Sequence, residues 1–219
     1  EQYNLLKHQA DQLAKSNVSI IEILGTIVEY RNLESGEHIQ RVKSYTRILG
    51  EQLMEDYPEY NLTSKQLNVI VSASALHDVG KIAIPDSILL KPGRLTKEEF
   101  EYMKEHTTKG CEIINNIRGV WSEEYARASY EICRHHHERY DGRGYPDGLL
   151  GENIPISAQL VAVADVYDVL VNERVYKSAF SADKAFNMII NGECGTFSPK
   201  LMDCFTKCRD RFESLAGER

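Results

Sequence analysis

The chain has 219 residues and a formal charge of −7, from 26 basic and 33 acidic side chains with the seven histidines taken as neutral. At 42% hydrophobic and 27% charged residues, the composition is that of an ordinary globular protein, and the length suits one domain with an appendage. No apolar run approaches the roughly 20 residues of a membrane-spanning helix. The excess of acid excludes a general nucleic-acid binder, because such proteins attract phosphate with Lys and Arg. It would also repel an anionic substrate.

The first predicted element is one long helix over residues 4–30. Its apolar residues predict a heptad seam with Asn17 inside it, a pattern typical of two-stranded coiled coils, where a polar seam residue fixes the register. The alternative is a helix that packs against the core of a domain. We favour the coiled coil and expect residues 1–24 to form a signalling and dimerisation helix, with the main domain over 25–219. The seam residues are Leu6, Ala10, Leu13, Asn17, Ile20, Leu24 and Ile27.

Further helices are predicted along the rest of the chain. Thr63 and Thr96 are expected caps, the second with the spacing of a capping box. Two loops, over 81–95 and 141–155, contain the Gly and Pro residues that interrupt helices. No alternating strand pattern longer than a few residues occurs, so the fold class is all-α. The predicted helices cover 36–57, 64–77, 97–105, 122–139 and 155–171, with another from Ser181 and the last from Ser198-Pro199.

The five cysteines are odd in number and scattered, with no C-x-x-C pair. This excludes a thiolate zinc site of the usual spacing and argues against a disulfide framework. We therefore expect free thiols and a cytoplasmic protein.

Histidines and carboxylates gather at particular helix positions. Glu34 and His38 are four residues apart and share one helical face, while His77-Asp78 ends an apolar helix. Asp165 lies on an otherwise apolar helix, where an isolated charge costs several kcal/mol unless it is paired or bound to a cation. Imidazole and carboxylate without thiolate suit Fe, Mn, Zn or Ni. The pattern therefore predicts a metal site.

The order of the motifs resembles the HD-GYP family, a branch of the HD phosphohydrolases. The resemblance covers about residues 25–210 and rests on Glu-x-x-x-His, His-Asp-x-Gly-Lys, a further His, His-His-Glu-x-x-Asp-Gly-x-Gly-Tyr-Pro, and Asp-Val-Tyr-Asp. It implies an HD-domain helical bundle behind the coiled-coil-like helix. It also implies two or three divalent ions, with Fe or Mn expected first and Ni or Zn open. An upstream sensor or receiver domain is a further expectation.

The resemblance implies a role for each matching residue. Lys81 would lie beside the scissile phosphate and act with Asp78 in catalysis. We expect Asp168 to orient a ligand or to cap packing rather than to bind metal. The metal ligands would be His38, His77, Asp78 and Asp165 for one ion, His106, His136 and His137 for a second, and Glu34 for a third. The substrate-binding residues would be Arg174, Lys177 and the loop residues Gly144, Tyr145 and Pro146.

Three positions depart from the family pattern. Val175 stands where a proline is usual, Gln159 where an arginine is common, and Arg143 enlarges and charges the signature loop. None of them removes a metal ligand. They therefore put substrate preference, and not metal binding, in question.

The resemblance implies hydrolysis of cyclic di-GMP to pGpG, and onward to GMP, by a hydroxide that bridges the metal ions. Two alternatives are a phosphodiesterase for another cyclic dinucleotide, such as cyclic GMP-AMP, and a catalytically silent signalling module. Silence is disfavoured because a degenerate module has no need of so many metal-type side chains. Two or three divalent ions would add four or six positive charges, so the formal charge of −7 does not exclude an anionic substrate.

Overall fold

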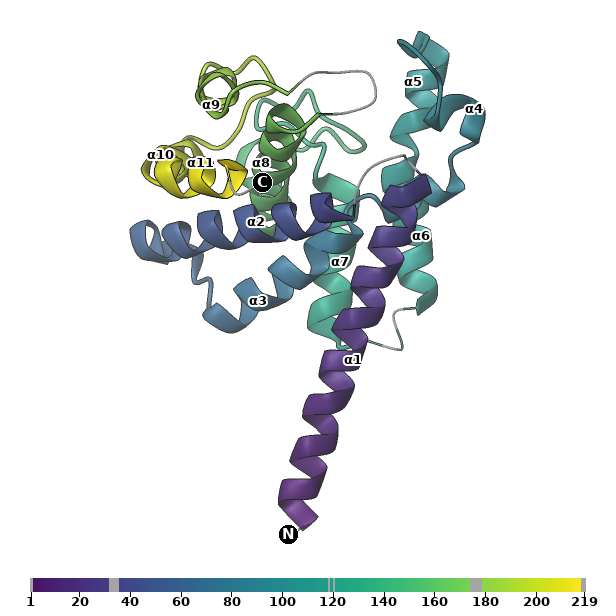
Figure 1. Cartoon of the computed structure of the whole chain (residues 1–219), viewed down its shortest axis with the longest axis vertical. Coiled ribbons are helices and arrows are strands. Elements are labelled where there is room, and N and C mark those ends of the chain that lie inside the picture. Colours follow the sequence, from purple (N-terminus) through teal and green to yellow (C-terminus); the bar gives the residue numbers. More distant parts are fainter. Residues whose placement is uncertain (1, 32–35, 118, 120, 174–178, 218–219) are drawn as a thin grey trace.

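The chain is a helical bundle from which a long N-terminal helix projects (Figure 1). The computed structural model describes residues 2–31, 36–117, 119, 121–173 and 179–217. Within these ranges there is no strand, and a single isolated backbone bridge pairs Asp141 with Leu150. The predicted all-α class is therefore confirmed. None of the described helices is both long enough and apolar enough to cross a membrane.

The helices follow one another with short connections. Four brief 3₁₀ segments, Pro58–Tyr60, Ser74–Leu76, Val79–Ala83 (η3) and Gly151–Asn153, lie between them. The α-helices are α1 (Gln2–Arg31), α2 (Glu37–Asp56), α3 (Ser64–Ala73), α4 (Asp86–Leu89), α5 (Lys97–Lys104), α6 (His106–Ile117), α7 (Glu123–His135), α8 (Ile156–Val171), α9 (Ala182–Ile190), α10 (Pro199–Lys207) and α11 (Arg209–Gly217).

The two predicted caps, Thr63 and Thr96, are confirmed. The Thr63 hydroxyl accepts a hydrogen bond from the backbone of Gln66, whose side chain accepts one in return, and Thr96 and Glu99 form the same capping box. Each box satisfies two N–H groups that a helix start leaves without an intrahelical partner. Local sequence alone is enough to specify such a start.

Several predicted helix ends were wrong. The helix expected over 122–139 ends at His135, because the following residues turn toward the Gly-rich loop. The helix expected over 64–77 ends at Ala73 and continues as a 3₁₀ turn. Helix α6 was not predicted, and the helix from Pro199 is not the last, because α11 follows it after a break at Cys208. No Gly or Pro marks that break.

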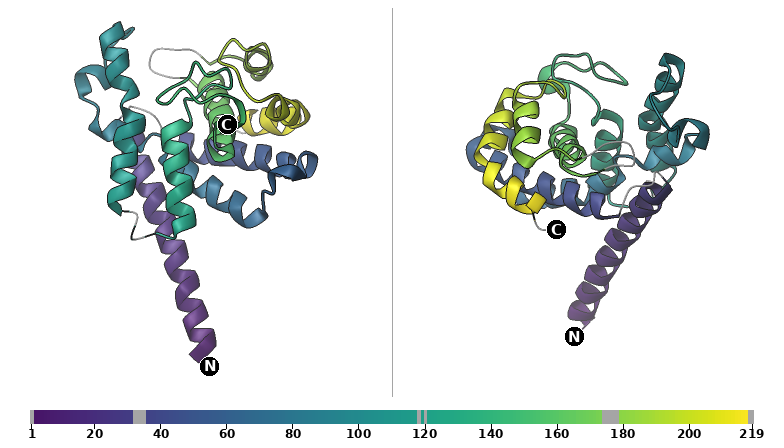
Figure 2. Two further views of the ribbon diagram at one scale, coloured as in Figure 1. Left: turned by 180° about the vertical axis from the view of Figure 1, so that it is seen from behind. Right: turned by 45° about the horizontal axis from the view of Figure 1, so that its top comes forward.

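Helix α8 lies at the centre of the bundle. It is buried along most of its length and packs against α2, α7 and α9. A helix that is apolar on every side is stable only when surrounded by protein. Figure 2 shows α8 between α7 and the C-terminal helices α10 and α11. The carboxylates of Asp165 and Asp168 are thereby carried into the interior.

Helix α1 has two apolar faces. Ile21 and Val28 are buried against the bundle, whereas Ile20, Leu24 and Ile27 of the predicted seam are exposed. The N-terminal part of the helix projects away from the other elements (Figure 1). The predicted domain boundary at residue 24 falls inside this continuous helix and stays a prediction.

Candidate metal centre

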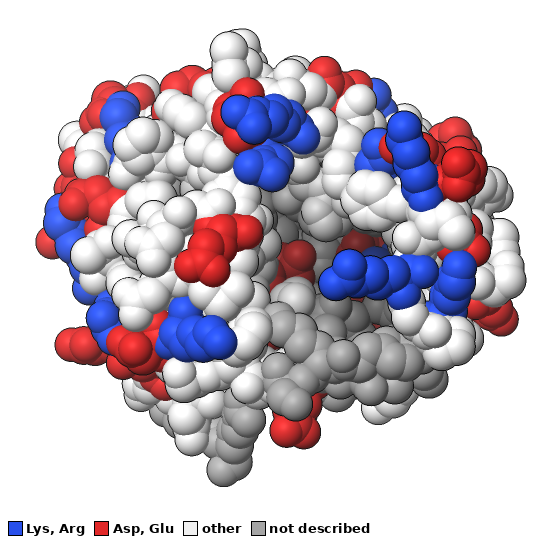
Figure 3. Space-filling view, turned by 90° about the horizontal axis from the view of Figure 1, so that it is seen from above, with Lys and Arg blue, Asp and Glu red and all other residues white. Residues whose placement is uncertain are grey.

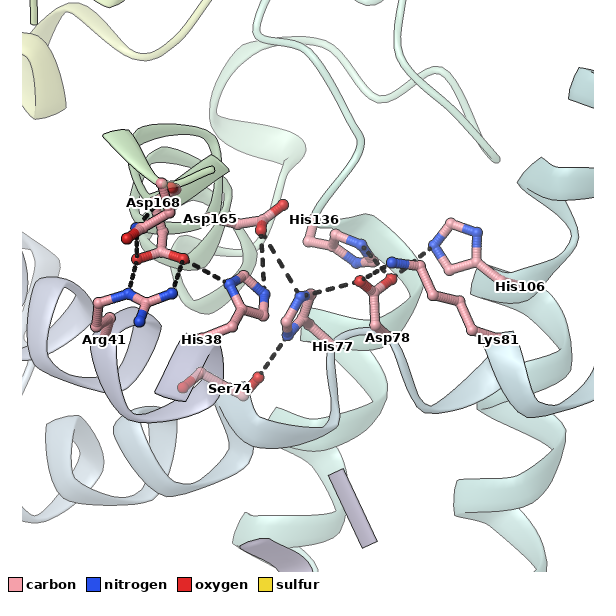
Figure 4. A network of polar contacts seen from close by, with 11 residues as sticks. His38, Arg41, Ser74, His77, Asp78, Lys81, His106, His136, Asp165 and Asp168 are labelled. Atoms are coloured by element: carbon pink, nitrogen blue, oxygen red, sulfur yellow. Dashed lines mark hydrogen bonds and ion pairs between the residues drawn. The ribbon is translucent and has the colours of Figure 1, made fainter. Parts of the chain in front are cut away.

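Elements that are distant in sequence bring most of the predicted ligands into one cluster, and Figure 4 shows His38, His77, Asp78, His106, His136 and Asp165. The cluster is buried, with His77 completely inaccessible and Asp78 only 7% exposed. It draws on the first turn of α2, the segment between α3 and η3, the start of α6, the residues just after α7, and the middle of α8. Its members are His38, His77, Asp78, His106, His136, His137 and Asp165.

Asp78 lies between two groups of histidines. Its Oδ2 is 3.2 Å from Nε2 of His77. Its Oδ1 is 3.3 Å from Nε2 of His106 and 3.7 Å from Nε2 of His136. On the far side of His77, Oδ1 of Asp165 is 3.6 Å from Nε2 of His38 and 3.9 Å from Nε2 of His77. The carboxylate of Asp78 is therefore within reach of His77 on one side and of His106 and His136 on the other.

Four of the imidazoles are held in the same manner, by a hydrogen bond from Nδ1. Because a carbonyl or carboxylate oxygen can only accept, Nδ1 carries the proton and the Nε2 lone pair is left for a ligand bond. All four Nε2 atoms are buried and have no hydrogen-bond partner within the described part of the chain. The donors and acceptors are His38 to Asp168 at 2.7 Å, His77 to the Ser74 carbonyl at 2.9 Å, His106 to the Met103 carbonyl at 2.8 Å, and His136 to the Ile132 carbonyl at 3.0 Å.

The ligand atoms form two sets, each spanning no more than 4.8 Å. One set contains Asp78, His106, His136 and His137, and the other contains Glu29, His38 and His77. Buried Nε2 atoms around carboxylates, without thiolate, fit divalent ions that accept mixed N and O ligands. The residues present therefore fit two divalent ions.

Burial and charge divide the histidines into two electrostatic classes. Burial alone would lower the pKa of His77, but the Asp78 carboxylate outweighs it and raises the pKa to about 10. Burial lowers the pKa of His106 to about 4 and that of His137 well below its usual value. Despite burial, Lys81 and then His77 hold the pKa of Asp78 well below its usual range. The site is thus organised around a carboxylate that attracts positive charge.

Lys81 lies within the cluster, next to Asp78. Its Nζ is 2.5 Å from Oδ2 of Asp78, and its carbonyl accepts a hydrogen bond from Arg31 at the end of α1. The sequence suggests that Gly80 allows a sharp exit from the helix, but its φ is not in the left-handed region. The structure gives another reason. A Cβ on Gly80 would collide with the carbonyl of His106, so glycine lets η3 pack directly on α6.

The signature loop, which contains Gly144, Tyr145 and Pro146, is fixed above the cluster by Glu138. This carboxylate accepts hydrogen bonds from the backbone N–H groups of Asp147, Gly148 and Leu149. Gly144 passes so close to the backbone of Glu138 that a Cβ would not fit. Tyr145 then stacks on His137, with ring centroids 4.8 Å apart and planes at 28°. The sequence analysis did not single out Glu138. Its place directly after His136-His137 and before the Gly-rich loop is the signal that could have identified it as an anchor of that loop.

Three of the predicted site residues fall outside the described residues: Glu34, Arg174 and Lys177. Asp168 accepts a hydrogen bond from His38, as expected of an orienting residue, and it also binds Arg41, which the sequence did not single out.

Glu29 is not among the predicted ligands, because the predicted seam uses only the outer face of α1. A signal was available: Ile21, Gly25, Val28 and Glu29 follow the spacing of one helical face, which puts an acid on the stripe that packs inward. Glu29 is only 2% exposed.

The face of the molecule seen from above is hollowed (Figure 3). Acidic side chains are visible inside the hollow, and Lys and Arg side chains stand around its rim. Such an arrangement suits a cation bound below an anion, because the acids attract the metal and the bases attract phosphate.

Comparison with known proteins places the chain in a family. The HD domain model matches residues 4–201. A cyclic di-GMP phosphodiesterase of Vibrio cholerae is 42% identical over 204 residues, which are 92% of this chain and 41% of that protein. The 3'3'-cGAMP-specific phosphodiesterase 2 of the same organism is 36% identical over 203 residues, 93% of this chain and 37% of that protein. The chain thus spans less than half the length of these relatives.

A solved structure shows the same fold. The crystal structure of a cyclic GMP-AMP specific phosphodiesterase of V. cholerae matches with a TM-score of 0.63 and 19% identity, over 91% of this chain and 50% of that one. At this identity the likeness concerns the fold alone. Together with the His-Asp motif at residues 77–78 and the Gly-Tyr-Pro loop at 144–146, these matches show that the chain belongs to the HD-domain family, in its HD-GYP branch.

Proposed function

We propose that this domain is a metal-dependent phosphodiesterase that hydrolyses cyclic di-GMP to linear pGpG, and onward to GMP. The observation that carries the proposal is the set of four Nε2 atoms around Asp78 and Asp165, each on a ring whose Nδ1 is already bonded. Such pre-orientation of imidazole is typical of metal sites and has little value for packing alone. The name of the relative that is 42% identical supports the substrate.

The chain's own residues would divide the work. His38, His77 and Asp165 would hold one divalent ion, and His106, His136 and His137 a second, with Asp78 shared between the two groups. Bound ions of this kind lower the pKa of a water molecule and offset charge on the phosphoryl oxygens. Lys81, with its ammonium beside Asp78, would neutralise a phosphoryl oxygen as charge develops there. Tyr145, stacked on His137, would close one side of the site and exclude bulk water.

The outer parts of the proposal concern residues outside the described ranges. Glu34 would add a ligand for a third ion, and Arg174 and Lys177 would bind the second phosphate of the dinucleotide. The Gly-rich loop, with Gly144, Tyr145 and Pro146, would leave room for a guanine base. Fe or Mn is the metal we expect first, with Ni and Zn as competitors for an N/O site.

The exposed seam of α1 supports a homodimer. Ile20, Leu24 and Ile27 continue the heptad pattern on a face that the bundle does not cover. Because the relatives are more than twice as long as the matched region, we propose that an upstream sensor or receiver acts through this helix. None of the five cysteines, all of which lie in the described part of the chain, forms a disulfide, which fits a cytoplasmic location.

A second candidate substrate is cyclic GMP-AMP. A relative named as a 3'3'-cGAMP-specific phosphodiesterase is 36% identical, close to the identity of the cyclic di-GMP relative. Val175 and Gln159, which depart from the family pattern, leave substrate preference open to this choice. Either substrate would be hydrolysed at the same metal centre. The two substrates differ only in their bases, which the enzyme would have to recognise.

The test combines metal analysis with product identification. Protein purified without oxygen is expected to contain two or three divalent ions and to convert cyclic di-GMP to pGpG faster than cyclic GMP-AMP when both are assayed side by side. His77→Ala should abolish hydrolysis and lower metal content while the circular dichroism spectrum stays helical. His8→Ala, an exposed histidine on α1, is the matched control and should retain both.

Three results would overturn parts of the proposal. Wild-type turnover by His77→Ala in a sample of known metal content would remove the assigned site. Faster turnover of cyclic GMP-AMP would exchange the substrate. Bound ions without hydrolysis of either dinucleotide would leave a silent signalling module.

A further inference from the structure

We infer that Glu29, near the end of α1, is an additional carboxylate ligand of the ion held by His38 and His77. The inference rests on the metal-dependent function proposed above and adds to it a residue from the N-terminal helix. None of the sequence motifs quoted above contains Glu29.

The position of the side chain carries the inference. Glu29 is only 2% exposed and lies on the inward face of α1, next to the buried Val28. A carboxylate oxygen of Glu29 and one ring nitrogen each of His38 and His77 lie within 4.8 Å of one another. In both histidines Nδ1 is bonded to another acceptor, so the atom left for a ligand is Nε2. Three donor groups from three separate elements thus lie close enough together to hold one ion.

The chemistry of the pocket fits a carboxylate at this position. An imidazole that binds a metal through Nε2 is neutral and brings no charge to balance a divalent cation, and oxygen ligands are the ones that Mn²⁺ accepts readily alongside imidazole. A carboxylate at this depth is stabilised by a cation close to it. A divalent ion between His38 and His77 would be such a cation. The carboxylates of Asp78 and Asp165 also lie near these histidines, at 3.2 Å from Nε2 of His77 and 3.6 Å from Nε2 of His38.

The inference joins α1 to the reaction centre. Two residues beyond Glu29, the guanidinium of Arg31 donates hydrogen bonds to the carbonyls of Lys81, Ile82 and Ile84 at 2.9, 2.6 and 2.7 Å. The end of α1 therefore holds the segment that bears Lys81 and, through Glu29, the first metal pocket. A displacement of α1 along its axis, or a rotation about it, would move both the segment that bears Lys81 and the metal pocket of His38 and His77.

The experiment measures metal binding directly. Protein freed of metal with a chelator is titrated with Mn²⁺, and free Mn²⁺ is followed by electron paramagnetic resonance. In Glu29→Gln, which keeps the shape but removes the charge, one Mn²⁺ site should weaken by at least about tenfold while the other keeps its affinity. The melting temperature of the metal-free variant should stay close to that of the wild type, and its rise on adding Mn²⁺ should shrink.

Glu37→Gln is the matched control. Glu37 precedes His38 directly, but its side chain is 82% exposed and points to Arg41. Loss of its charge should leave both Mn²⁺ affinities unchanged, which separates a ligand from a general charge effect.

Two outcomes would overturn the inference. One is Mn²⁺ binding by Glu29→Gln at the wild-type affinity. The other is a metal-free variant that melts far below the wild type and loses both sites equally, since that pattern belongs to a structural residue. If Glu29→Gln fails to fold, Glu29→Asp keeps the charge with a shorter reach, and unchanged affinity there would equally contradict a ligand role. These titrations need no dinucleotide, so they decide on Glu29 even if cyclic di-GMP proves not to be the substrate.

Discussion

At the scale of single residues, the metal centre depends on how each imidazole is held. For three of the four rings the acceptor is a backbone carbonyl, but for His38 it is the carboxylate of Asp168. Asp168 is itself fixed by Arg41, whose Nε lies 2.6 Å and Nη2 3.2 Å from its two oxygens, and by Asn172 at 2.9 Å. A charged acceptor makes the imidazole a stronger ligand than a carbonyl does. Arg41 thus stabilises a ligand that it does not touch.

The contacts from Arg41 to Asp168 and from Asp168 to His38 predict how much the free energy of unfolding falls when Arg41 is removed. In Arg41→Gln the buried Asp168 loses its guanidinium partner and keeps only His38 and Asn172, so we expect the free energy of unfolding of the metal-free protein to fall by about 2 kcal/mol. Urea denaturation measures it. Glu37→Gln removes the exposed partner of the same arginine and should cost no more than about 0.5 kcal/mol. Equal losses in the two variants would show that Asp168 does not depend on Arg41.

Single residues also show what the sequence could and could not predict at the site. The resemblance to the HD-GYP family implied that His77, Asp78, His106 and the pair His136-His137 act together, and the structure brings them into one cluster. Glu29 could not be recognised in the same way. Its burial depends on which face of α1 packs inward, and that choice is made by the rest of the bundle.

At the scale of elements, the signature loop is an ordered structure without an apolar core of its own. Glu138 binds three of its backbone N–H groups, and Arg134 forms a bidentate pair with Asp147 at 2.7 Å for each contact. Both anchors come from the end of α7 or just after it. The loop therefore keeps Tyr145 over His137 by charge and hydrogen bonds, which makes its stability sensitive to pH.

The pH dependence has a definite sign. The hydrogen bond from Arg134 holds the pKa of Asp147 below its usual value, although burial opposes it. A group with a lowered pKa stabilises the folded state at pH above its unfolded value of about 3.9, and that contribution is lost as the pH falls through the folded value. We therefore expect the melting temperature of Asp147→Asn to fall less steeply below about pH 4 than that of the wild type. Thermal melts across this range, followed by circular dichroism, measure the slopes.

The control for this prediction is Asp210→Asn, at an exposed position of α11. It should melt with the wild-type pH dependence. If Arg134→Gln and Asp147→Asn gave different slopes from one another, the pair would not be the origin of the effect.

The elements also show why helix starts were easier to predict than helix ends. Thr63, Thr96 and Ser122 cap their helices through hydrogen bonds to residues three positions later, so the whole signal is local. The end of α7 at His135 depends instead on the contact between Glu138 and a loop about ten residues away. Such an end is fixed by tertiary structure and leaves no mark in the local pattern.

At the scale of the whole molecule, α1 is the element that would link the outside of the molecule to the proposed metal centre. Its inner face carries Ile21, Val28 and Glu29 into the bundle, and its outer face presents Ile20 and the rest of the seam. A second copy bound along the outer face would leave the inner contacts in place. Dimerisation and metal binding would then meet on opposite sides of one helix, only a few residues apart.

The dimer gives the last prediction. Wild-type protein should elute as a dimer at micromolar concentration in size-exclusion chromatography with light scattering. Leu24→Glu and Ile27→Glu place charges in the seam of both copies, where they repel each other and lose apolar contact, so each variant should be a monomer. Because both side chains are exposed on the described surface, at 38% and 55%, the bundle's melting temperature should not change. Gln12→Glu, at an exposed position of α1 outside the seam, should remain dimeric, and a dimer that survived both seam variants would place the contact on another surface.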